Sequence, residues 1–555
     1  MGIPSYYRKL IRSCPHLVQD GTNAKEIQWL FMDYNCLIYH CLHRPDAPVY
    51  PLEAETDSSI KAIWERDFIQ SVVEYTVYVI QQVNAEKGVY LAIDGVVPMA
   101  KMRQQRLRRF KSSWLSSQGY GRDGKKETET DEKDTGARWN TNAITPGTVF
   151  MDNLYDALVR RIKSEGKTGI WRISSCREWG EGEHKIVAEW RKGYDGKGRD
   201  GKGYDGAIAV YGLDADLIVL SLLGIDVCGL QEGVWLFREV VEKGATQYDM
   251  FGKEKYEWFS VDELRRWLVA PYLGTPQMEQ SFIVQYTCMM SFLGNDFLPS
   301  SLSYKMRDDG HGVLLDLLRW FFAGNVFLVG GAEEGYPIQW DGLMAFFQAL
   351  ALNESERITN AIWKKKRMAH GIQGNNLVGV GHEDWPLAVM EEEVLLDSRG
   401  QLAGDWEHQY LSHFFHGFSV HPSSQKTLCR HYLYGIQWVW AYYLGRTEEV
   451  CFEWWYPFSL PPLWKWLAES KELPTFVGTV QVRGSEIDPT EQLALVLPLE
   501  SWSLLPPCPQ RALPYRAPHL FPTEFSFDSV GKRFFWECES MIPVPTIREV
   551  KAWCS

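Results

Sequence analysis

Three short apolar runs, each ending in an acidic residue, constrain the fold of this chain more than any other feature. They read IQWLFMD, ending at Asp33, VYLAID, ending at Asp94, and AIAVYGLDAD, ending at Asp214 and Asp216. Each run has the length and apolar content of a buried strand, and the stretches 61–85 and 151–163 between them have helical patterns. Strands separated by helices predict an α/β fold, with a mostly parallel central sheet flanked by helices.

The acids at the ends of these runs form a candidate metal site, because ligands of parallel sheets bind at the carboxyl ends of the strands. Further acids stand beside glycines in EWGEGEHK and SFLGNDFLPS. The complete candidate set is Asp33, Asp94, Glu181, Glu183, Asp214, Asp216 and Asp296. Any one of them alone is more easily explained as a helix cap or a solvated residue. Together they are too many for one acid/base pair.

Hard cations such as Mg²⁺ prefer several oxygen ligands, and two ions about 3.5–4 Å apart need a shared acidic cluster. A zinc site is disfavoured, because the chain has no HExxH motif and its Cys and His residues lack zinc-finger spacing. We therefore expect a phosphodiester hydrolase with a two-metal mechanism, in which the seven acids are both the metal ligands and the catalytic residues.

A basic stretch follows the second of these acids. It carries six Lys or Arg residues in the eleven positions from Lys101 to Lys111, although the formal net charge of the chain is −13 and its pI is about 5.6. Such a run is most often the solvated face of a helix. The acidic net charge argues against a surface that binds polyanions in general, so a polyanion would have to bind at a local cluster of positive charge.

On a helix beginning after Pro98, one stripe of side chains faces away from the apolar residues Leu107, Phe110 and Trp114. The stripe consists of Lys101, Gln105, Arg108 and Arg109. The helix can bury its apolar side and present three cations and an amide to the acids. Such groups suit a terminal phosphate, which carries more charge than an internal phosphodiester. The pattern predicts an enzyme that selects a nucleic-acid end.

The organisation of the chain suggests three parts. Residues 1–305 are predicted to form the nuclease domain, 306–404 a variable helical connecting region, and 405–555 a second, aromatic-rich α+β lobe that completes the active-site channel. Two polar segments, about 117–140 and 192–206, are predicted to be flexible loops. The second of these is a triple repeat of the type KGYDG.

Composition also limits where the chain acts. No apolar run approaches the roughly 20 residues of a membrane span, so no membrane partner is expected. Eleven cysteines, without a CxxC pair, suit a reducing compartment. We expect an intracellular protein, with the cytoplasm favoured over the nucleus.

At these residues the sequence resembles the XRN family of 5′→3′ exoribonucleases. The motifs that carry the resemblance occur in family order through about residue 305. They are MGIPSYYRKL, FMDYNCLIYHCLH, AIDGVVPMAKMRQQRLRRF, NAITPGTVFM, GEGEHKI, VYGLDADLIVLSLL and FLGNDFLPS. Weaker similarity continues in GIQWVWAYYLG, FEWWYPF, LALVLP and FPTEFSFDSVGKRFFWE.

The resemblance implies a core like that of PIN and flap nucleases, with the seven acids around two Mg²⁺ ions that Mn²⁺ can replace. It implies that Lys101, Gln105, Arg108 and Arg109 hold the 5′-monophosphate of an RNA. The family's histidine that stacks on the leading base is Tyr39 here, and Tyr can still stack. A family tryptophan that helps position the RNA corresponds to Trp454 or a neighbour, for which a core aromatic is an equal alternative.

The function implied is Mg-dependent 5′→3′ degradation of single-stranded RNA that bears a 5′-monophosphate, releasing nucleoside 5′-monophosphates in RNA turnover. Two alternatives stay open. One is a structure-specific DNA nuclease of the flap-endonuclease type, which shares an acidic cluster on a sheet. The other is an RNA-binding scaffold without catalysis, which the presence of all seven acids disfavours.

Overall fold

The computed structural model describes most of the chain. The residues described are 3, 5–118, 139–167, 170–194, 204–230, 233–242, 245–270, 274–370, 387, 390–415, 422–471, 474, 487–506 and 517–554. The loops predicted at 117–140 and 192–206 lie largely outside these residues.

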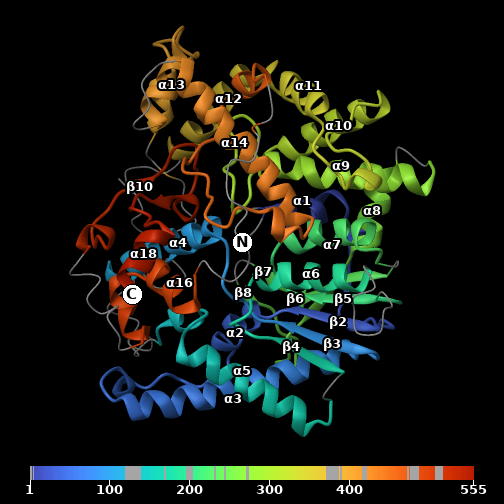
Figure 1. The fold of residues 1–555 in the computed structure, drawn as a ribbon, viewed down its shortest axis with the longest axis vertical. Coiled ribbons are helices and arrows are strands. Elements are labelled where there is room, and N and C mark those ends of the chain that lie inside the picture. The colour runs from blue at the N-terminus through green and yellow to red at the C-terminus, as the bar shows by residue number, and fades with distance from the viewer. Residues whose placement is uncertain are drawn as a thin grey trace.

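A seven-stranded sheet forms the centre of the molecule, in the order β1-β9-β6-β5-β2-β3-β4 (Figure 1). Its strands are β1 (Val18–Asp20), β2 (Trp29–Asp33), β3 (Gly88–Ala92), β4 (Trp171–Ser174), β5 (Ile208–Tyr211), β6 (Val234–Glu239) and β9 (Tyr256–Ser260). The five strands from β6 to β4 pair in parallel, whereas β9 pairs antiparallel with β6 and β1. The mostly parallel α/β sheet predicted from the sequence is confirmed.

Helices cover both faces of this sheet, as a parallel sheet of apolar strands requires. On one face lie α3 (Ser58–Val83) and α5 (Val149–Ser164), which correspond to the predicted helical stretches 61–85 and 151–163. On the other lie α6 (Gly182–Tyr194), α7 (Asp216–Val227), α8 (Val261–Val269) and α9 (Pro276–Met290) (Figure 1). All four residues of β5 are buried between these layers.

The remainder of the chain is largely helical in its described residues. Its elements are α10 (Gly310–Ala323), α11 (Trp340–Ala351), α12 (Glu354–His370), α13 (Trp406–Phe414), α14 (Pro422–Tyr443), α15 (Trp464–Ala468), α16 (Pro489–Val496) and α18 (Ile547–Cys554). A two-stranded sheet of β10 (Phe527–Asp528) and β11 (Glu539–Ser540) accompanies them. Aromatic side chains of α14 and α15 join the same hydrophobic cluster as α6, α7 and α9.

Helix α4 (Met99–Ser117) connects the N-terminal and C-terminal regions. It packs against α16 and β11, and Phe110 is buried there as the helical pattern predicts (Figure 1). Arg106 is also buried, and donates to the carbonyl oxygens of Leu495 at 2.6 Å and Pro543 at 3.0 Å and to that of Leu520. Part of the basic run therefore holds the C-terminal region in place.

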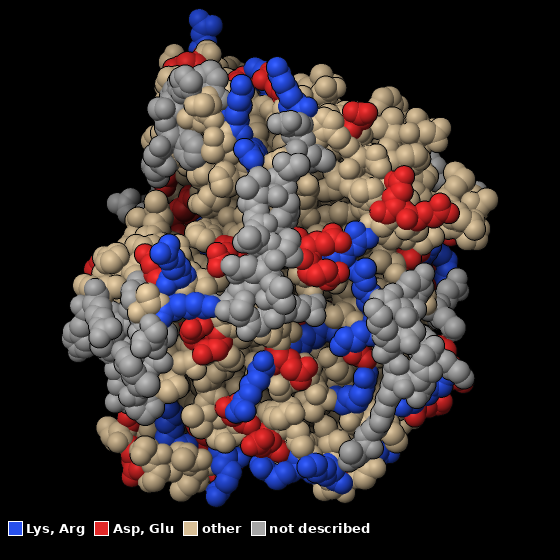
Figure 2. All heavy atoms as spheres, viewed as in Figure 1, with Lys and Arg blue, Asp and Glu red and all other residues tan. Residues whose placement is uncertain are grey.

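Charged residues of both signs are interspersed among the described residues on the face drawn in Figure 2. Among the helices that the structure describes, none is both long and apolar enough to cross a membrane.

Candidate active site

The predicted acids meet at the carboxyl edge of the sheet. Asp33 ends β2, and because β2 pairs in parallel with both β3 and β5, the segments carrying Asp94 and Asp214 leave the sheet at the same edge. Asp216 is the first residue of α7, directly beyond. Carboxylate oxygens of Asp33, Glu183 and Asp214 lie within 4.8 Å of one another, a grouping that can hold a metal ion.

The GEGE segment brings two further carboxylates to this edge. Gly180 has a φ of +104°, which favours glycine, and its N–H donates to the carbonyl of Val96 at 2.8 Å. Gly182 begins α6, and its N–H donates to Asp94 Oδ1 at 2.7 Å. A Cβ at position 182 would lie 2.4 Å from Asp33 Oδ1, so only glycine allows the helix to begin this close to the acids.

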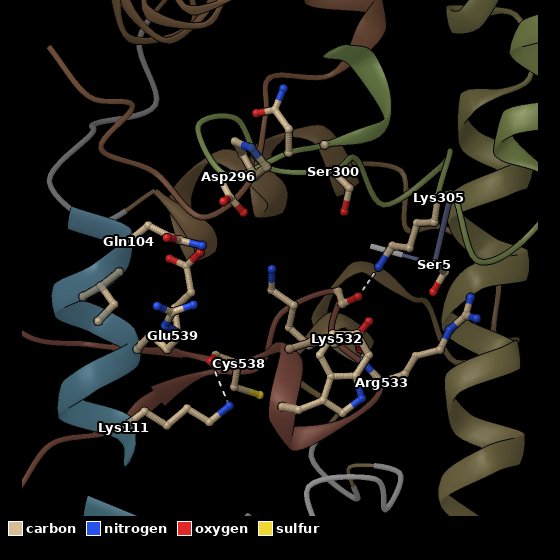
Figure 3. Close-up of a pocket in the computed structure, with 18 of the residues that line it drawn as sticks. Ser5, Gln104, Lys111, Asp296, Ser300, Lys305, Lys532, Arg533, Cys538 and Glu539 are labelled. Carbon is tan, nitrogen blue, oxygen red and sulfur yellow. Dashed lines mark hydrogen bonds between the residues drawn. The ribbon is translucent and has the colours of Figure 1, made fainter. Parts of the chain in front are cut away.

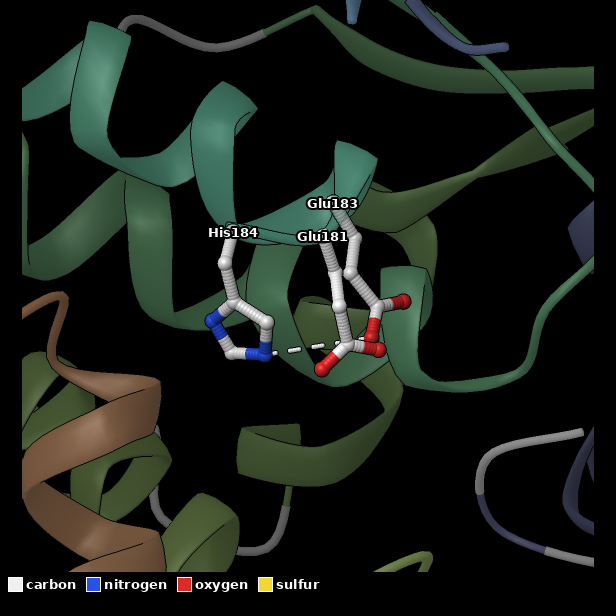
Figure 4. Close-up of side chains that lie close together, drawn as sticks. All are labelled: Glu181, Glu183 and His184. Atoms are coloured by element: carbon white, nitrogen blue, oxygen red, sulfur yellow. Dashed lines mark ion pairs between the residues drawn. The ribbon is translucent and has the colours of Figure 1, made fainter. Parts of the chain in front are cut away.

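Glu181 and Glu183 therefore project side by side, with His184 next to them (Figure 4). One ligand atom from each of the three lies within 4.8 Å of the others, and His184 Nε2 is 3.8 Å from Glu183 Oε1. Sequence analysis did not select His184, although it follows directly in GEGEHK. Burial lowers the pKa of His184 to about 3, so the imidazole is neutral and can accept.

Asp296 joins the cluster through Lys101. Lys101 Nζ lies 2.5 Å from Glu181 Oε2 and 2.7 Å from Asp296 Oδ2. Burial by itself raises the pKa of Asp296, but the ammonium of Lys101 outweighs it and lowers that pKa to about 2. The lysine that was predicted to bind phosphate thus pairs with two carboxylates here, and its contact with a phosphate stays a prediction.

Three of the other carboxylates carry strongly perturbed pKa values. Burial, reinforced by neighbouring carboxylates, raises the pKa of Asp33 and Glu183 well above the usual range, and burial followed by Asp296 raises that of Asp216 to about 7. Among the described residues, the buried oxygens Glu183 Oε2 and Asp216 Oδ1 have no hydrogen-bond partner. A divalent cation would neutralise the charge of these crowded carboxylates and give their unpartnered oxygens a ligand role.

Tyr442 of α14 reaches the cluster from the far end of the chain. Its hydroxyl donates to Glu181 Oε1 at 3.0 Å across 261 residues, and its ring centroid lies 3.6 Å from that of His184. The segment GIQWVWAYYLG was noted for its family resemblance, but no local pattern assigns this hydroxyl to the acids.

The remaining members of the basic stripe lie beside the cluster on α4. Gln105 and Arg109 are buried, whereas Arg108 is exposed. Burial lowers the pKa of Arg109 to about 10, opposed by the nearby groups Tyr39 and Asp94. Within the described structure, Gln105 Oε1 and Arg109 Nη1 are buried and have no hydrogen-bond partner. Of these two atoms only Arg109 Nη1 is a donor, so among the buried groups of the stripe it is the one available to an anion, together with the exposed guanidinium of Arg108.

The two aromatic residues predicted to stack on RNA have different surroundings. Tyr39, on α2 (Asn35–Leu42), is 36% exposed. Trp454 is half-buried and packs against Trp438 and Tyr434, with ring centroids 5.2 and 5.5 Å away. Stacking on RNA stays a prediction for both.

The fold and the site define an α/β protein with a buried carboxylate cluster at the carboxyl edge of its sheet and a basic helix beside it. The family model described as "XRN 5'-3' exonuclease N-terminus" matches residues 1–228, and "Xrn1 helical domain" matches residues 391–551. Together the two matches cover more than half of the chain. The chain belongs to the XRN family.

Curated relatives of the chain are named 5'-3' exoribonucleases. The chain is 30% identical over 364 residues to "5'-3' exoribonuclease 2" of Debaryomyces hansenii, covering 57% of this chain and 35% of that protein. It is 25% identical over 602 residues to "5'-3' exoribonuclease 1" of Homo sapiens, covering 98% of this chain and 33% of that protein. The chain therefore spans about a third of the length of these relatives. A solved structure of the T5 D15 protein, co-crystallised with metal ions, aligns at a TM-score of 0.25 and 11% identity, covering 62% of this chain and 94% of that one.

Proposed function

We propose that the protein is a metal-dependent 5′→3′ exoribonuclease that degrades single-stranded RNA bearing a 5′-monophosphate and releases nucleoside 5′-monophosphates. The observation that carries the proposal is the buried carboxylate cluster lying directly beside the basic stripe of α4, to which Lys101 links it. The names of the curated relatives, which are 5'-3' exoribonucleases, support the RNA substrate and the 5′→3′ direction.

The donor set suits Mg²⁺, because almost every group in the cluster offers oxygen. The residues that would hold the metal are Asp33, Asp94, Glu181, Glu183, Asp214, Asp216 and Asp296. When bound there, divalent ions supply an activated water and neutralise charge at the leaving oxygen. The partnerless oxygens of Glu183 and Asp216 support this assignment.

The protein's own side chains would select and orient the RNA. Arg108 and Arg109 offer guanidinium forks and Gln105 an amide to the 5′-phosphate, which fixes the position of the first phosphodiester. Tyr39, which lies near enough to Arg109 to influence its pKa, offers a ring for the leading base. Such contacts read phosphate and stacking rather than base identity, so we expect little sequence preference.

The test is digestion of one 3′-labelled RNA that carries a 5′-monophosphate, a 5′-triphosphate or a 5′-hydroxyl, with Mg²⁺ or with EDTA. We expect only the monophosphate RNA to disappear, only with Mg²⁺, and not with Asp214→Ala. Asp316→Asn, at an exposed carboxylate of α10, is the matched control and should retain activity.

Equal cutting of all three ends would refute the 5′-phosphate assignment. No cutting of any of them would favour an RNA-binding scaffold. A branched DNA in the same panel separates the flap-type nuclease, which would cut it in preference to the RNA.

A further inference from the structure

Two cavities adjoin the residues of the candidate active site. The first, of about 450 Å³, lies between α4, residues 293–307 and residues 531–539, and Figure 3 shows Asp296 in its wall. It therefore belongs to the site already described. The second, of about 480 Å³, is lined in part by β3, by α6 and by the segments that follow β3 and β4. Lys185 of α6 lies in the wall of this second cavity and is buried.

Lys185 has no part in the proposed chemistry, although it stands only two positions from Glu183 in GEGEHK. Residues two apart on a helix are turned by about 200° from each other, so Lys185 leaves α6 on a different side from Glu183. Its Nζ donates to the carbonyl oxygen of Ile93 at 2.6 Å and to that of Ser175 at 2.8 Å. A buried ammonium is costly unless it is hydrogen-bonded, so both contacts stabilise its present position.

The carbonyl of Ile93 belongs to the same peptide group as the N–H of Asp94. This peptide group lies just beyond β3, whose register with β2 ends at Ala92. Its N–H is held as well, because Asp94 N donates to Oδ1 of Asn35, the first residue of α2, at 3.2 Å. Side chains from two different helices therefore hold the two polar groups of one peptide.

The peptide group on the other side of Asp94 is also fixed. The N–H of Gly95 donates to the carbonyl of Gly180 at 2.9 Å, and a Cβ at position 95 would lie 1.6 Å from the carbonyl oxygen of Glu178. Because each peptide group is planar, fixing both of them fixes the direction of the Asp94 side chain. In that direction Asp94 Oδ1 accepts the N–H of Gly182 at 2.7 Å.

The second contact of Lys185 ties this arrangement to the neighbouring strand. Ser175 directly follows β4, in the segment that leads to Glu181. One ammonium thus joins the helix that carries Glu183, the segment that carries Asp94 and the segment that leads to Glu181.

We propose that Lys185 and Asn35 are positioning residues, which hold the peptide group between Ile93 and Asp94 so that the Asp94 carboxylate is directed at the metal site. The inference rests on the proposed function, because it takes Asp94 to be a metal ligand. Lys185 and Asn35 themselves contact neither the metal nor the RNA.

The first test measures metal binding by the full chain, so that it does not depend on turnover. Electron paramagnetic resonance of free Mn²⁺ gives the Mn²⁺ affinity of the wild type, Lys185→Ala and Asn35→Ala. We expect each variant to bind Mn²⁺ about tenfold more weakly or worse, as when a group that orients a metal ligand is removed. In Mg²⁺ their kcat should fall by about the same factor, whereas the KM for RNA should not change.

The second test uses the cavity next to Lys185. Lys185→Ala removes the side chain beyond Cβ from the cavity wall, so an added alkylammonium can occupy its place. We expect propylammonium to restore much of the Mn²⁺ affinity of Lys185→Ala, because it supplies N–H donors to the two carbonyls. Tetramethylammonium, which has the same charge and no N–H donor, should not restore it.

The matched control is Lys192→Ala, which removes an exposed lysine from the same helix and the same cavity wall and should bind Mn²⁺ like the wild type. Circular dichroism and thermal unfolding check that each variant is folded. If Lys185→Ala does not fold, Lys185→Met replaces it in the binding measurement, and Asn35→Ala tests the same peptide group from its other side.

Wild-type Mn²⁺ affinity in either folded variant, an equal loss in Lys192→Ala, or equal rescue by the two ammonium ions would overturn the positioning role. A wild type that binds Mn²⁺ with the expected losses in the variants, but does not degrade 5′-phosphorylated RNA in Mg²⁺, would refute the proposed function while supporting the positioning role.

Discussion

Tyr442→Phe tests whether the C-terminal region contributes to the acidic cluster. The substitution removes one hydroxyl, which donates to Glu181 Oε1 at 3.0 Å, and keeps the ring that packs on His184. A hydrogen bond to a charged group contributes about 1.5–3 kcal/mol. Because Glu181 retains its ion pair with Lys101 at 2.5 Å, we take the lower end of this energy range. That free energy corresponds to about a tenfold change in an equilibrium constant.

The loss of activity should appear in the metal-dependent step, because Glu181 would no longer be held in its present orientation. The assay is the initial rate of RNA degradation as a function of Mg²⁺ concentration. We expect Tyr442→Phe to need about tenfold more Mg²⁺ for the same rate, with its thermal unfolding little changed.

Tyr443→Phe is a closely matched control, because Tyr443 is the next residue of α14, is also buried, and its hydroxyl has no hydrogen-bond partner among the described residues. It should behave like the wild type. If both variants lose the same activity, or if Tyr442→Phe loses none, the positioning of Glu181 by Tyr442 is refuted.

Three further predictions test the site and the packing of the fold. Gly182→Ala should lower kcat/KM about a hundredfold with an unchanged circular dichroism spectrum, because its Cβ would lie 2.4 Å from Asp33 Oδ1; a variant with wild-type kcat/KM would contradict this. Burial raises the pKa of Glu354 to about 8. The buried, protonated carboxyl therefore makes its full contribution to stability below the pKa that Glu354 has in the unfolded chain, and this contribution is lost as the pH rises through about 8. The thermal unfolding midpoint should fall over that range, and less so in Glu354→Gln. Arg106→Leu should destabilise the protein by about 3–5 kcal/mol, because two buried carbonyl oxygens and one partly buried carbonyl oxygen lose their charged donor. A midpoint within a degree or two of the wild type in a thermal scan would count against it.

The central sheet and the position of its acids could be predicted from the sequence, because both follow from local patterns. A buried parallel strand is a short apolar run, and its carboxyl end is where the run stops, so Asp33, Asp94 and Asp214 could be placed at one edge before any contact was known. The helical period likewise predicts that α4 buries Phe110 and turns Arg108 away from it.

What the side chains contact was decided by the tertiary structure. The sequence determines that Lys101 and Arg106 lie on one basic helix, but only the packed molecule shows that the first pairs with two carboxylates and the second holds C-terminal carbonyls. Tyr442 comes from a segment hundreds of residues beyond the strands that end in the acids, and no period relates it to them. Hydrophobic periodicity reports which face of an element is buried, whereas the partner that buries it depends on how distant elements pack.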